Sequence, residues 1–408
     1  MSSPRIDEER IARDIEAIAG CSETDPRVGY SRPTFSSSWR RARDYVLARA
    51  AEAGGSAWID AAGNAHARAA GLEAGHRAWL CGSHIDSVPT GGKFDGVVGV
   101  VVALEVLRAA PGAPVELIVF AEEEGSTFSL GMVGSRAWAG SLPPDKLRLL
   151  RNAEGRDYLT AGEEHGVSAE RLSAERLEPG KYLGLIEAHV EQGPGMWNAG
   201  TPIAVVTAIA GRRQYTCTLT GEANHAGATR MKDRKDALAG AAEGIGALEA
   251  WAKDMEAEQG ATVLTVGRLE VQPNSVNVIP GRASFTIDFR ARSDDTLARG
   301  DLALRGIVSG VASRRGLGCD LVCNEDLPAV RLDPGLCSLL RDAARRQGVE
   351  AQDAVSGALH DTAILAPYLP AAMIFVASRG GISHNPAEFS RIEDVASAAR
   401  IVAEAVRE

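Results

Sequence analysis

Histidine and carboxylate side chains gather in a few short segments of this chain, at spacings that could hold metal ions. His84 and Asp86 lie two residues apart, Asp95 follows in a glycine-rich segment, and three consecutive glutamates occupy positions 122–124. Imidazole is a good ligand for zinc-type ions, and a nearby carboxylate commonly orients it through its other nitrogen. Three adjacent carboxylates repel one another in apolar surroundings unless a cation lies among them, although a solvated acidic loop is the alternative. These residue types therefore predict a metal site.

Two further histidines follow apolar stretches, as ligands at the ends of buried strands would. His189 lies in Ile-Glu-Ala-His-Val-Glu-Gln-Gly-Pro, and His384 lies in Gly-Gly-Ile-Ser-His-Asn-Pro. Either histidine alone is more often a core or loop residue than a ligand. A single carboxylate such as Asp95 can bridge two cations, and two metals about 3.5–4 Å apart can polarise a carbonyl and supply a hydroxide. We interpret three other histidines as surface or packing residues, namely His66, His76 and His165.

Alternating strand-like and helix-like segments must position these side chains. We expect a helix from the serines at 36–38 to about residue 53, ended by two glycines, and a buried helix at 97–109. The expected strands are 57–60, 65–69, 78–84 and 114–121. Strands that alternate with helices and end in polar, glycine-rich loops predict an α/β sheet with its functional site at the carboxyl ends of the strands.

The pattern changes near residue 211 and changes back near residue 329. The expected elements of this block are, in order, a strand at 213–220, a helix at 233–256, strands at 262–271 and 282–291, a helix at 294–313 and a strand at 319–323. This β-α-β-β-α-β order predicts a ferredoxin-like α+β domain at 212–328. The α/β domain that it interrupts comprises 1–211 and 329–408, with later elements expected at 333–347 (helix, capped by Asp333), 372–377 (strand) and from 392 onward (helix).

The composition narrows the function classes. A chain of 408 residues with 45% hydrophobic and 24% charged residues suits a soluble protein of two domains, and the net charge of −10 argues against nucleic acid or an anionic membrane as partner. The first twenty residues form an acidic amphipathic stretch without the plan of a signal peptide, and no apolar run approaches the ~20 residues of a membrane span. The six scattered cysteines are interpreted as reduced, mostly buried thiols, so a cytoplasmic protein is expected.

These segments resemble a known group of enzymes. The resemblance runs from about Gly29 to the C-terminus and rests on ordered motifs. They are Gly-Ser-His-Ile-Asp-Ser-Val (82–88), Gly-Lys-Phe-Asp-Gly (92–96), Glu-Glu-Gly-Ser (123–126), His-Val-Glu-Gln-Gly-Pro (189–194), Gly-Glu-Ala-Asn-His-Ala-Gly (221–227), Pro-Asn-Ser-Val-Asn-Val-Ile-Pro-Gly (273–281), Asp-Phe-Arg (288–290), Gly-Ala-Leu-His-Asp (357–361) and Gly-Ile-Ser-His (381–384). The chain resembles the M20 metallopeptidase family, and within it the amidase branch of N-carbamoyl-L-amino-acid hydrolases, allantoate amidohydrolases and β-ureidopropionases.

The resemblance implies a zinc-peptidase-like catalytic domain, with a mixed sheet flanked by helices, that holds two divalent metals per subunit. His84 and His189 would bind one ion, Glu124 and His384 the other, and Asp95 would bridge them. Zinc is the expected metal, and manganese, cobalt or nickel suits the same ligands.

The same resemblance assigns the proton chemistry. Glu123 would be the general base that takes a proton from the metal-bound water and delivers it to the leaving nitrogen, and Asp86 would support the centre. The register of the triple glutamate leaves an alternative, in which Glu122 is the base and Glu123 the ligand. Placing the Glu-Glu pair directly before Gly125, as the branch does, favours Glu123 and Glu124.

The inserted domain would act as a lid and form a homodimer. The resemblance implies substrate contacts from Gln192, His225, Asn277, Arg290, Gly357 and His360. Among these, His225 would stabilise the oxyanion, from its own or the partner subunit, and Arg290 would grip a carboxylate through paired hydrogen bonds. The alternative for Arg290 is a surface ion pair with Asp288. Departures from the branch pattern occur at Thr127, 228–231 and Leu359, in the lid and the substrate-facing loops rather than among the metal ligands.

The expected reaction is hydrolysis of a linear amide C–N bond in a small carboxylate-bearing N-carbamoyl or ureido substrate, with metal-bound hydroxide as nucleophile. Two other functions remain open at this point, which are a dipeptidase or deacylase on the same scaffold and a non-catalytic carboxylate-binding protein. Gln192, Asn277 and Arg290 suit a small polar substrate and disfavour the peptidase. The complete set of ligand and base candidates disfavours the non-catalytic protein.

Overall fold

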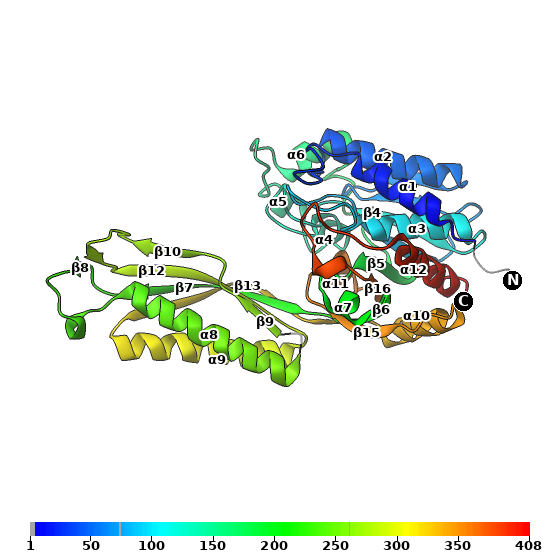
Figure 1. Cartoon of the computed structure of the whole chain (residues 1–408). Helices are drawn as coiled ribbons and strands as arrows, with labels where there is room; N and C mark the ends of the chain where they lie inside the picture. Colours follow the sequence, from blue (N-terminus) through cyan, green and yellow to red (C-terminus); the bar gives the residue numbers. More distant parts are fainter. Residues whose placement is uncertain (1–4, 73–74, 261) are drawn as a thin grey trace. The chain divides into compact units, whose positions relative to one another are not determined.

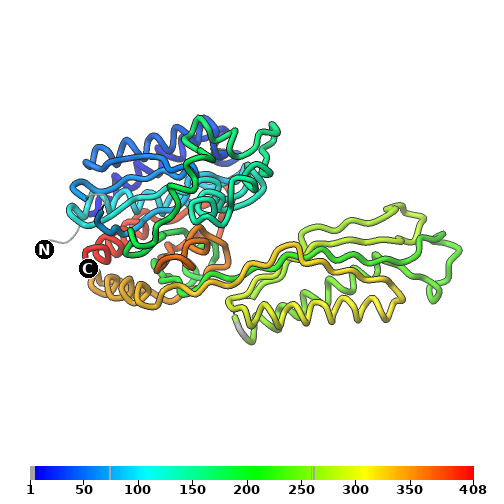
Figure 2. The backbone as a smooth tube through the Cα atoms, turned by 180° about the vertical axis from the view of Figure 1, so that it is seen from behind, coloured from blue at the N-terminus to red at the C-terminus, as the bar shows by residue number. Residues whose placement is uncertain are grey.

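The computed structural model describes residues 5–72, 75–260 and 262–408, and the chain divides into two compact units. The first unit comprises the chain up to Thr207, Leu332–Ala354 and His360–Glu408. The second unit comprises Ala208–Arg331 and Val355–Leu359. Figure 1 shows the elements of both units, and Figure 2 follows the backbone from behind.

A mixed sheet forms the centre of the first unit. Its strand order is β1-β2-β4-β3-β5-β16-β6, and β14 and β15 pair beside β6. The strands are β1 (Ser56–Ile59), β2 (Ala65–Arg68), β3 (Ala78–His84), β4 (Val115–Phe120), β5 (Tyr182–Val190), β6 (Ile203–Ile209), β15 (Gln352–Ser356) and β16 (Ala371–Val376). The short strand β14 (Val330–Arg331) belongs to the second unit, as do its partners Ala208 and Ile209 at the end of β6. Neighbouring strands among β4, β3, β5 and β16 are parallel, whereas β2 and β6 run antiparallel to their inner neighbours.

Helices cover the parallel strands. Helix α3 (Val97–Ala109) packs on β3, β4 and β5, and α12 (Ile392–Ala405) packs on α3 and β16. Every residue of β3, β4 and β16 is buried, which explains why these strands are mostly apolar and do not alternate between apolar and polar residues. The other helices of this unit are α1 (Glu8–Ala19), α2 (Ser37–Glu52), α4 (Val133–Trp138), α5 (Pro144–Leu147), α6 (Tyr158–Gly162), α7 (Gly195–Ala199), α10 (Pro334–Arg346), α11 (Asp361–Leu365) and the 3-10 turns η1 (Glu163–His165), η2 (Pro179–Lys181) and η4 (Arg379–Gly381).

Two helix starts follow the predicted capping. The Ser36 side chain accepts a hydrogen bond from the Trp39 backbone N–H at the start of α2. The Asp333 side chain accepts one from Leu336 at the start of α10, with Pro334 as the first helical residue. Each cap satisfies a backbone donor that has no partner within the helix.

The second unit is an antiparallel sheet with two long helices. The sheet order is β10-β12-β7-β13, and β9 also pairs with β12. This order of a β-α-β-β-α-β chain is the ferredoxin-like arrangement that the sequence predicts. Its elements are β7 (Gly211–Thr220), β8 (Asn224–His225), η3 (Met231–Asp233), α8 (Ala237–Gln259), β9 (Thr262–Thr265), β10 (Leu269–Gln272), β11 (Val278–Ile279), β12 (Arg282–Ala291), α9 (Asp294–Arg315) and β13 (Gly318–Leu327). Its core holds Tyr215, Phe285 and Phe289.

Several predicted details are wrong. The single strand expected at 262–271 is two strands, β9 and β10, which pair with different parts of β12. Helix α8 begins at Ala237, where Asp236 caps it, rather than at residue 233. Cys319 and Cys323 are exposed on β13, so the cysteines are not mostly buried. Of the two alternatives given for His66, surface or packing, the structure shows packing, because the residue is buried between two carboxylates.

In the part of the chain that the structure describes, no helix has both the length and the apolar character that crossing a bilayer requires.

Candidate metal centre

The predicted ligands of the first unit lie at one edge of its sheet. His84 is the last residue of β3, the three glutamates come directly after Ala121 at the end of β4, and His189 is the last but one residue of β5. His384 lies in the loop that follows β16. Because β3, β4, β5 and β16 are parallel, their carboxyl ends share this edge, where α/β sheets commonly carry their sites.

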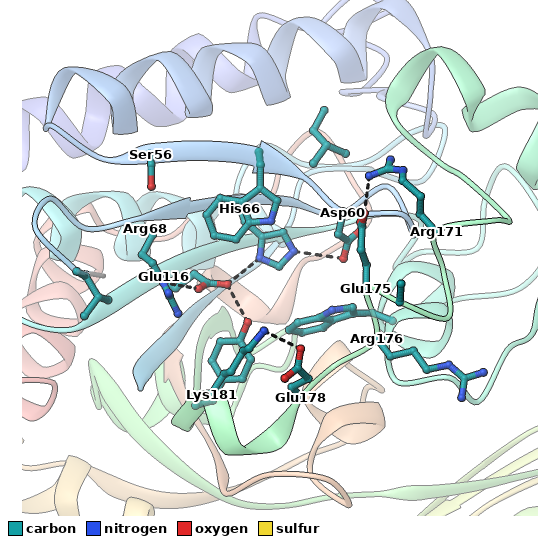
Figure 3. Close-up of a pocket in the computed structure, with 16 residues that line it drawn as sticks. Ser56, Asp60, His66, Arg68, Glu116, Arg171, Glu175, Arg176, Glu178 and Lys181 are labelled. Atoms are coloured by element: carbon teal, nitrogen blue, oxygen red, sulfur yellow. Dashed lines mark hydrogen bonds and ion pairs between the residues drawn. The ribbon is translucent and has the colours of Figure 1, made fainter. Parts of the chain in front are cut away.

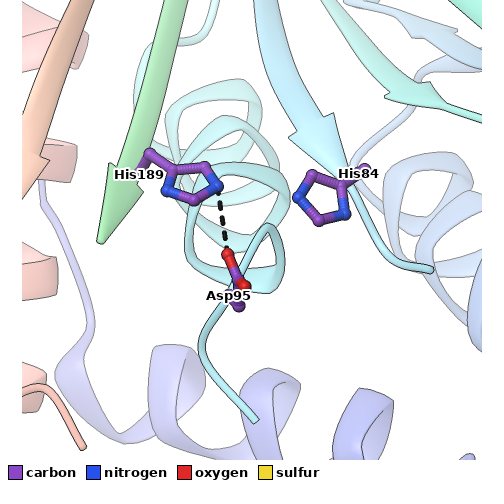
Figure 4. Close-up of side chains that lie close together, drawn as sticks. All are labelled: His84, Asp95 and His189. Carbon is purple, nitrogen blue, oxygen red and sulfur yellow. Dashed lines mark ion pairs between the residues drawn. The ribbon is translucent and has the colours of Figure 1, made fainter. Parts of the chain in front are cut away.

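His84, Asp95 and His189 form one group of possible metal ligands. One ligand atom of each lies within 4.8 Å of the others, and all three residues are buried. Figure 4 shows both rings turned toward the Asp95 carboxylate, with His189 Nε2 3.3 Å from Asp95 Oδ1. Nδ1 of His84 faces the Asp86 carbonyl at 3.0 Å, and Nδ1 of His189 faces the Val190 carbonyl at 2.9 Å. These contacts assign the ring protons to Nδ1 and leave each Nε2 as a ligand atom.

Asp95, Glu124 and His384 form a second group. Their ligand atoms also lie within 4.8 Å of one another. His384 Nε2 is 3.1 Å from Asp95 Oδ2 and 3.5 Å from Glu124 Oε2. The two oxygens of Asp95 therefore belong to different groups. His384 is 48% exposed, unlike the buried ligands of the first group, so this group has access to solvent.

A glycine makes the first group possible. Gly96 has φ +66°, and a Cβ on this residue would lie 2.5 Å from the His84 ring. Any other residue at this position would clash with the imidazole unless the ring or the backbone moved. The flanking glycine of the predicted ligand loop thus allows a close approach of backbone and ring.

The buried carboxylates and imidazoles of this region favour bound cations. Burial, followed by repulsion from Glu124, raises the pKa of Glu123 well above its usual value, and burial followed by Asp95 does the same for Glu124. Burial lowers the pKa of His84 to about 4, so this imidazole is neutral and able to ligate. His189 Nε2 is buried and makes no hydrogen bond. Buried carboxylates and an imidazole nitrogen that faces one of them without a hydrogen bond fit a divalent metal, which would neutralise the carboxylates and bind the nitrogen.

The triple glutamate splits between two roles. Glu122 has φ +57° and turns away from the ligands, because its Oε1 accepts hydrogen bonds from the Thr127 and Phe128 N–H groups at 2.8 and 2.6 Å. Glu123 Oε2 lies 3.7 Å from His84 Nε2, and Glu124 belongs to the second group. The geometry thus favours the register with Glu123 and Glu124 over the one with Glu122 and Glu123.

Asp86 contacts the His84 ring through a different group from the expected carboxylate. Its backbone carbonyl, at 3.0 Å, orients the His84 ring, whereas its carboxylate Oδ1 is 3.7 Å from the same nitrogen. The carboxylate Oδ2 instead accepts a hydrogen bond from the Glu124 N–H at 3.1 Å. Asp86 therefore ties the loop after β3 to the loop after β4.

Arg32 supports the same loop and has no signal in the sequence. Its side chain is fully buried, and Nε donates to the Ile85 carbonyl at 2.7 Å. Its backbone N–H donates to Ser87 Oγ at 2.9 Å. A lone arginine in a segment without periodicity gives no indication that it is buried.

Gln192 and His360, both predicted to contact substrate, lie against predicted metal ligands. The Gln192 amide donates to both Asp95 oxygens at 3.2 and 3.1 Å. The His360 ring packs on the His189 ring with centroids 4.4 Å apart, and with Glu187 these histidines form a third group of possible ligands. Glu187 already accepts hydrogen bonds from Ser83 and Thr362, which leaves it less suited to bind an ion.

The other predicted substrate residues form two pairs in the second unit. His225 and Asn277 lie beside each other, because the Ala226 N–H donates to the Asn277 carbonyl at 3.0 Å. Both side chains are exposed. Arg290 donates to Asp288 at 2.8 Å, which is the ion pair considered as an alternative, and also to the Gly357 carbonyl at 3.0 Å. Its contact with Asp288 leaves the carboxylate-binding role of Arg290 a prediction.

A polar cavity of about 560 Å³ in the first unit has a different character. None of the predicted site residues lines it. Glu116, near the start of β4, and Tyr182, the first residue of β5, contribute to its wall, so it lies toward the opposite ends of these strands. Figure 3 shows His66 between Asp60 and Glu116, at 3.3 and 3.0 Å. We interpret this cluster as a buried structural ion network.

Comparisons with known proteins agree with the arrangement at the strand ends. Residues 80–408 match peptidase family M20/M25/M40. The chain is 39% identical to an N-carbamoyl-L-amino acid amidohydrolase from Geobacillus stearothermophilus, over 92% of both chains. It is 35% identical to an allantoate amidohydrolase from Escherichia coli (strain K12), over 93% of this chain and 92% of the relative. A solved amidase of the hydantoinase/carbamoylase family from Burkholderia multivorans aligns with a TM-score of 0.89 and 34% identity, over 98% of this chain and 97% of that one. The chain therefore belongs to peptidase family M20/M25/M40, as a hydrolase of its hydantoinase/carbamoylase amidase branch.

Proposed function

We propose that this chain is a binuclear metal-dependent amidohydrolase that cleaves a linear, non-peptide C–N bond of an N-carbamoyl or ureido substrate bearing a carboxylate. The observation that carries the proposal is the position of Asp95. Its Oδ1 faces His189 at 3.3 Å, and its Oδ2 faces His384 at 3.1 Å. A carboxylate with one oxygen in each of two ligand groups suits the bridge of a two-metal site.

The two groups would hold one ion each. His84 and His189 would bind the first, Glu124 and His384 the second, and Asp95 both. Divalent ions bound there would polarise the substrate carbonyl and make a water molecule acidic enough to attack it at neutral pH. The neutral Nδ1–H tautomer of both buried histidines prepares the first pair for this role.

Glu123 is the general base of the proposal. Its carboxylate lies 3.7 Å from His84 Nε2, beside the first group, and is 9% exposed. Burial and carboxylate neighbours raise its pKa, and nearby cations would bring that pKa back toward neutrality, where a base both accepts and returns a proton well. Glu123 takes the proton of the attacking water and delivers it to the leaving nitrogen.

We infer the substrate class from the names of the relatives. Proteins named for N-carbamoyl-L-amino acids and for allantoate match over nearly the whole chain. Both compounds combine a ureido group with a carboxylate. Gln192, His225, Asn277 and Arg290 supply amide, imidazole and guanidinium groups for such a substrate, and a homodimer formed through 212–328 is proposed with them. A cytoplasmic location stays a prediction.

A substrate panel tests the reaction. Protein reconstituted in turn with zinc, manganese, cobalt or nickel is assayed for ammonia release from N-carbamoyl-L-amino acids, N-carbamoyl-β-alanine and allantoate, beside dipeptide cleavage. Hydrolysis of an N-carbamoyl amino acid yields the amino acid, carbon dioxide and ammonia. We expect ammonia release from at least one of the N-carbamoyl or ureido compounds and no cleavage of dipeptides. Cleavage of dipeptides alone would replace the proposal with a peptidase, and less than one divalent ion per chain would refute the two-metal site.

A further inference from the structure

Glu388 joins two segments that carry metal ligands. The residue is 3% exposed and lies four positions after His384. Its Oε2 accepts hydrogen bonds from two consecutive backbone N–H groups, those of Phe94 at 2.8 Å and Asp95 at 3.0 Å. Its Oε1 accepts a hydrogen bond from Ser383 Oγ at 2.8 Å. One carboxylate thus contacts the residue that bridges the two ligand groups and the residue directly before His384.

The backbone around Asp95 is shaped to admit this carboxylate. A Cβ on Gly92 would lie 2.1 Å from Glu388 Oε2, so the close approach depends on glycine at that position. Two hydrogen bonds from neighbouring N–H groups fix the orientation of the peptide between Phe94 and Asp95. The direction of the Asp95 side chain follows from that orientation, because its Cα–Cβ bond is attached to the same backbone.

Ser383 extends the contact to the side chains of the centre. Its hydroxyl lies 2.8 Å from Glu388 Oε1 and 3.3 Å from Asp95 Oδ2, and the Gln192 amide lies within 3.4 Å of it. A hydroxyl has one proton, and the shorter contact assigns it to Glu388. Both oxygens of Asp95 then keep lone pairs for cations.

We propose that Glu388 is a positioning residue of the metal centre, which holds the bridging Asp95 and the His384 loop at the separation that two cations need. The inference rests on the proposed two-metal site. Removal of a residue that holds metal ligands in place typically weakens metal binding by about 10–100-fold. Glu388 touches neither group of ligand atoms directly, so its effect passes through the backbone N–H groups and Ser383.

Three variants separate positioning from charge. Glu388→Ala removes every contact. Glu388→Gln keeps an oxygen for the two N–H groups and presents an amide to Ser383, whose proton then turns toward Asp95 Oδ2. Ser383→Ala leaves the backbone contacts and removes the link to the hydroxyl. Glu105→Gln is the matched control, because Glu105 is also a fully buried carboxylate of the first unit and pairs with Arg10, away from the ligands.

Two measurements on the full chain read out the effect without relying on activity. The first is competition with a chromophoric chelator for zinc, which gives the dissociation constants. The second is amide hydrogen exchange of metal-free protein over the peptide that contains Phe94 and Asp95. We expect Glu388→Ala to weaken zinc binding by about 10–100-fold and to speed exchange of both amides. Glu388→Gln and Ser383→Ala should fall between Glu388→Ala and wild type, and Glu105→Gln should match wild type.

The possible failures are distinguishable. Wild-type zinc affinity and unchanged amide exchange in Glu388→Ala would overturn the positioning role and leave the two-metal site intact. Equal losses in Glu105→Gln would show a general effect of removing buried charge and would also overturn it. Failure of the wild-type chain to bind two ions would overturn the proposed function together with this inference. If Glu388→Ala does not fold, wild-type affinity and exchange in both Glu388→Gln and Ser383→Ala would refute it.

Discussion

The buried ion network around His66 makes stability depend on pH in a direction that can be measured. Its ring lies between Glu116 and Asp60, and Glu116 also accepts hydrogen bonds from Arg68 and Tyr182. Burial alone would lower the pKa of His66, but the hydrogen bonds to Asp60 and Glu116 outweigh it and raise the pKa from 6.5 to about 9. The folded chain therefore binds the His66 proton more tightly than the unfolded chain does.

The size of the effect follows from the two pKa values. The interval from 6.5 to about 9 corresponds to about 3 kcal/mol of folding free energy, at about 1.4 kcal/mol for each pH unit. Because the folded pKa is the higher one, this contribution is complete below pH 6.5, declines as the pH rises and is gone above about pH 9. Between about pH 7 and about pH 9.5, the imidazolium should therefore lose about 2 kcal/mol of its contribution.

Urea unfolding of wild type and His66→Gln over this pH range provides the assay. Glutamine keeps a donor in the network but takes no charge, so titrations common to both proteins cancel in their difference. Metal-free protein is used, which removes the pH dependence of metal binding. We expect the stability advantage of wild type to shrink by about 2 kcal/mol as the pH rises. His76→Gln, which changes an exposed histidine of the same unit, should show a constant difference from wild type.

A constant difference between wild type and His66→Gln across this range would refute the reasoning. It would mean that folding does not raise the pKa of His66 above its value in the unfolded chain. A difference that grows with pH would refute it as well, because only a lowered pKa gives that sign.

Three further outcomes concern the metal centre. Glu123→Gln should keep its metal content and lower kcat, measured by ammonia release, by about 10²–10⁴-fold, whereas Glu122→Gln should stay active. The reverse result would assign the base to Glu122. Asp95→Asn should reduce the metal content measured by mass spectrometry, because a neutral amide bridges two cations poorly, and two ions per chain in this variant would contradict the bridge. Removing metal with a chelator should lower the free energy of unfolding by about 2.7 kcal/mol for each site that was held at about 100 times its Kd, and an unchanged value would argue against occupied sites in the native chain.

The strands that carry the ligands were the most predictable part of the fold. The expected strand 78–84 and helix 97–109 coincide with β3 and α3, because a fully buried parallel strand and the helix that covers it both need continuous apolar runs. The expected strand 262–271 was harder. β9 and β10 pair with different halves of β12, and this division depends on tertiary pairing that local composition does not encode.

The ligand residues could be predicted, but their supports could not. His84, His189 and His384 stand out because histidine is rare in this chain and each follows an apolar segment. Arg32 and Glu388 give no comparable signal, since arginine and glutamate are common and usually exposed. Their roles depend on which backbone groups the fold brings to them. The Ile85 carbonyl that Arg32 contacts lies 53 positions along the chain from it, and the Asp95 N–H that Glu388 contacts lies 293 positions from it.

The difference between the ligand residues and the residues that support them has one electrostatic cause. Asp86, Asp95, Glu123 and Glu388 are all buried near one edge of the sheet, and burial of each carboxylate opposes its charged form. Such a cluster is stable in the absence of cations only if hydrogen bonds from backbone and side chains hold each carboxylate in place. Glu122, Asp86 and Glu388 obtain these bonds from the chain, from Phe128, Glu124 and Phe94 respectively. Among the described contacts, no backbone N–H donates to the carboxylate of Glu123 or Glu124. These are the two glutamates that the proposed reaction needs free, Glu123 to take a proton and Glu124 to bind a metal.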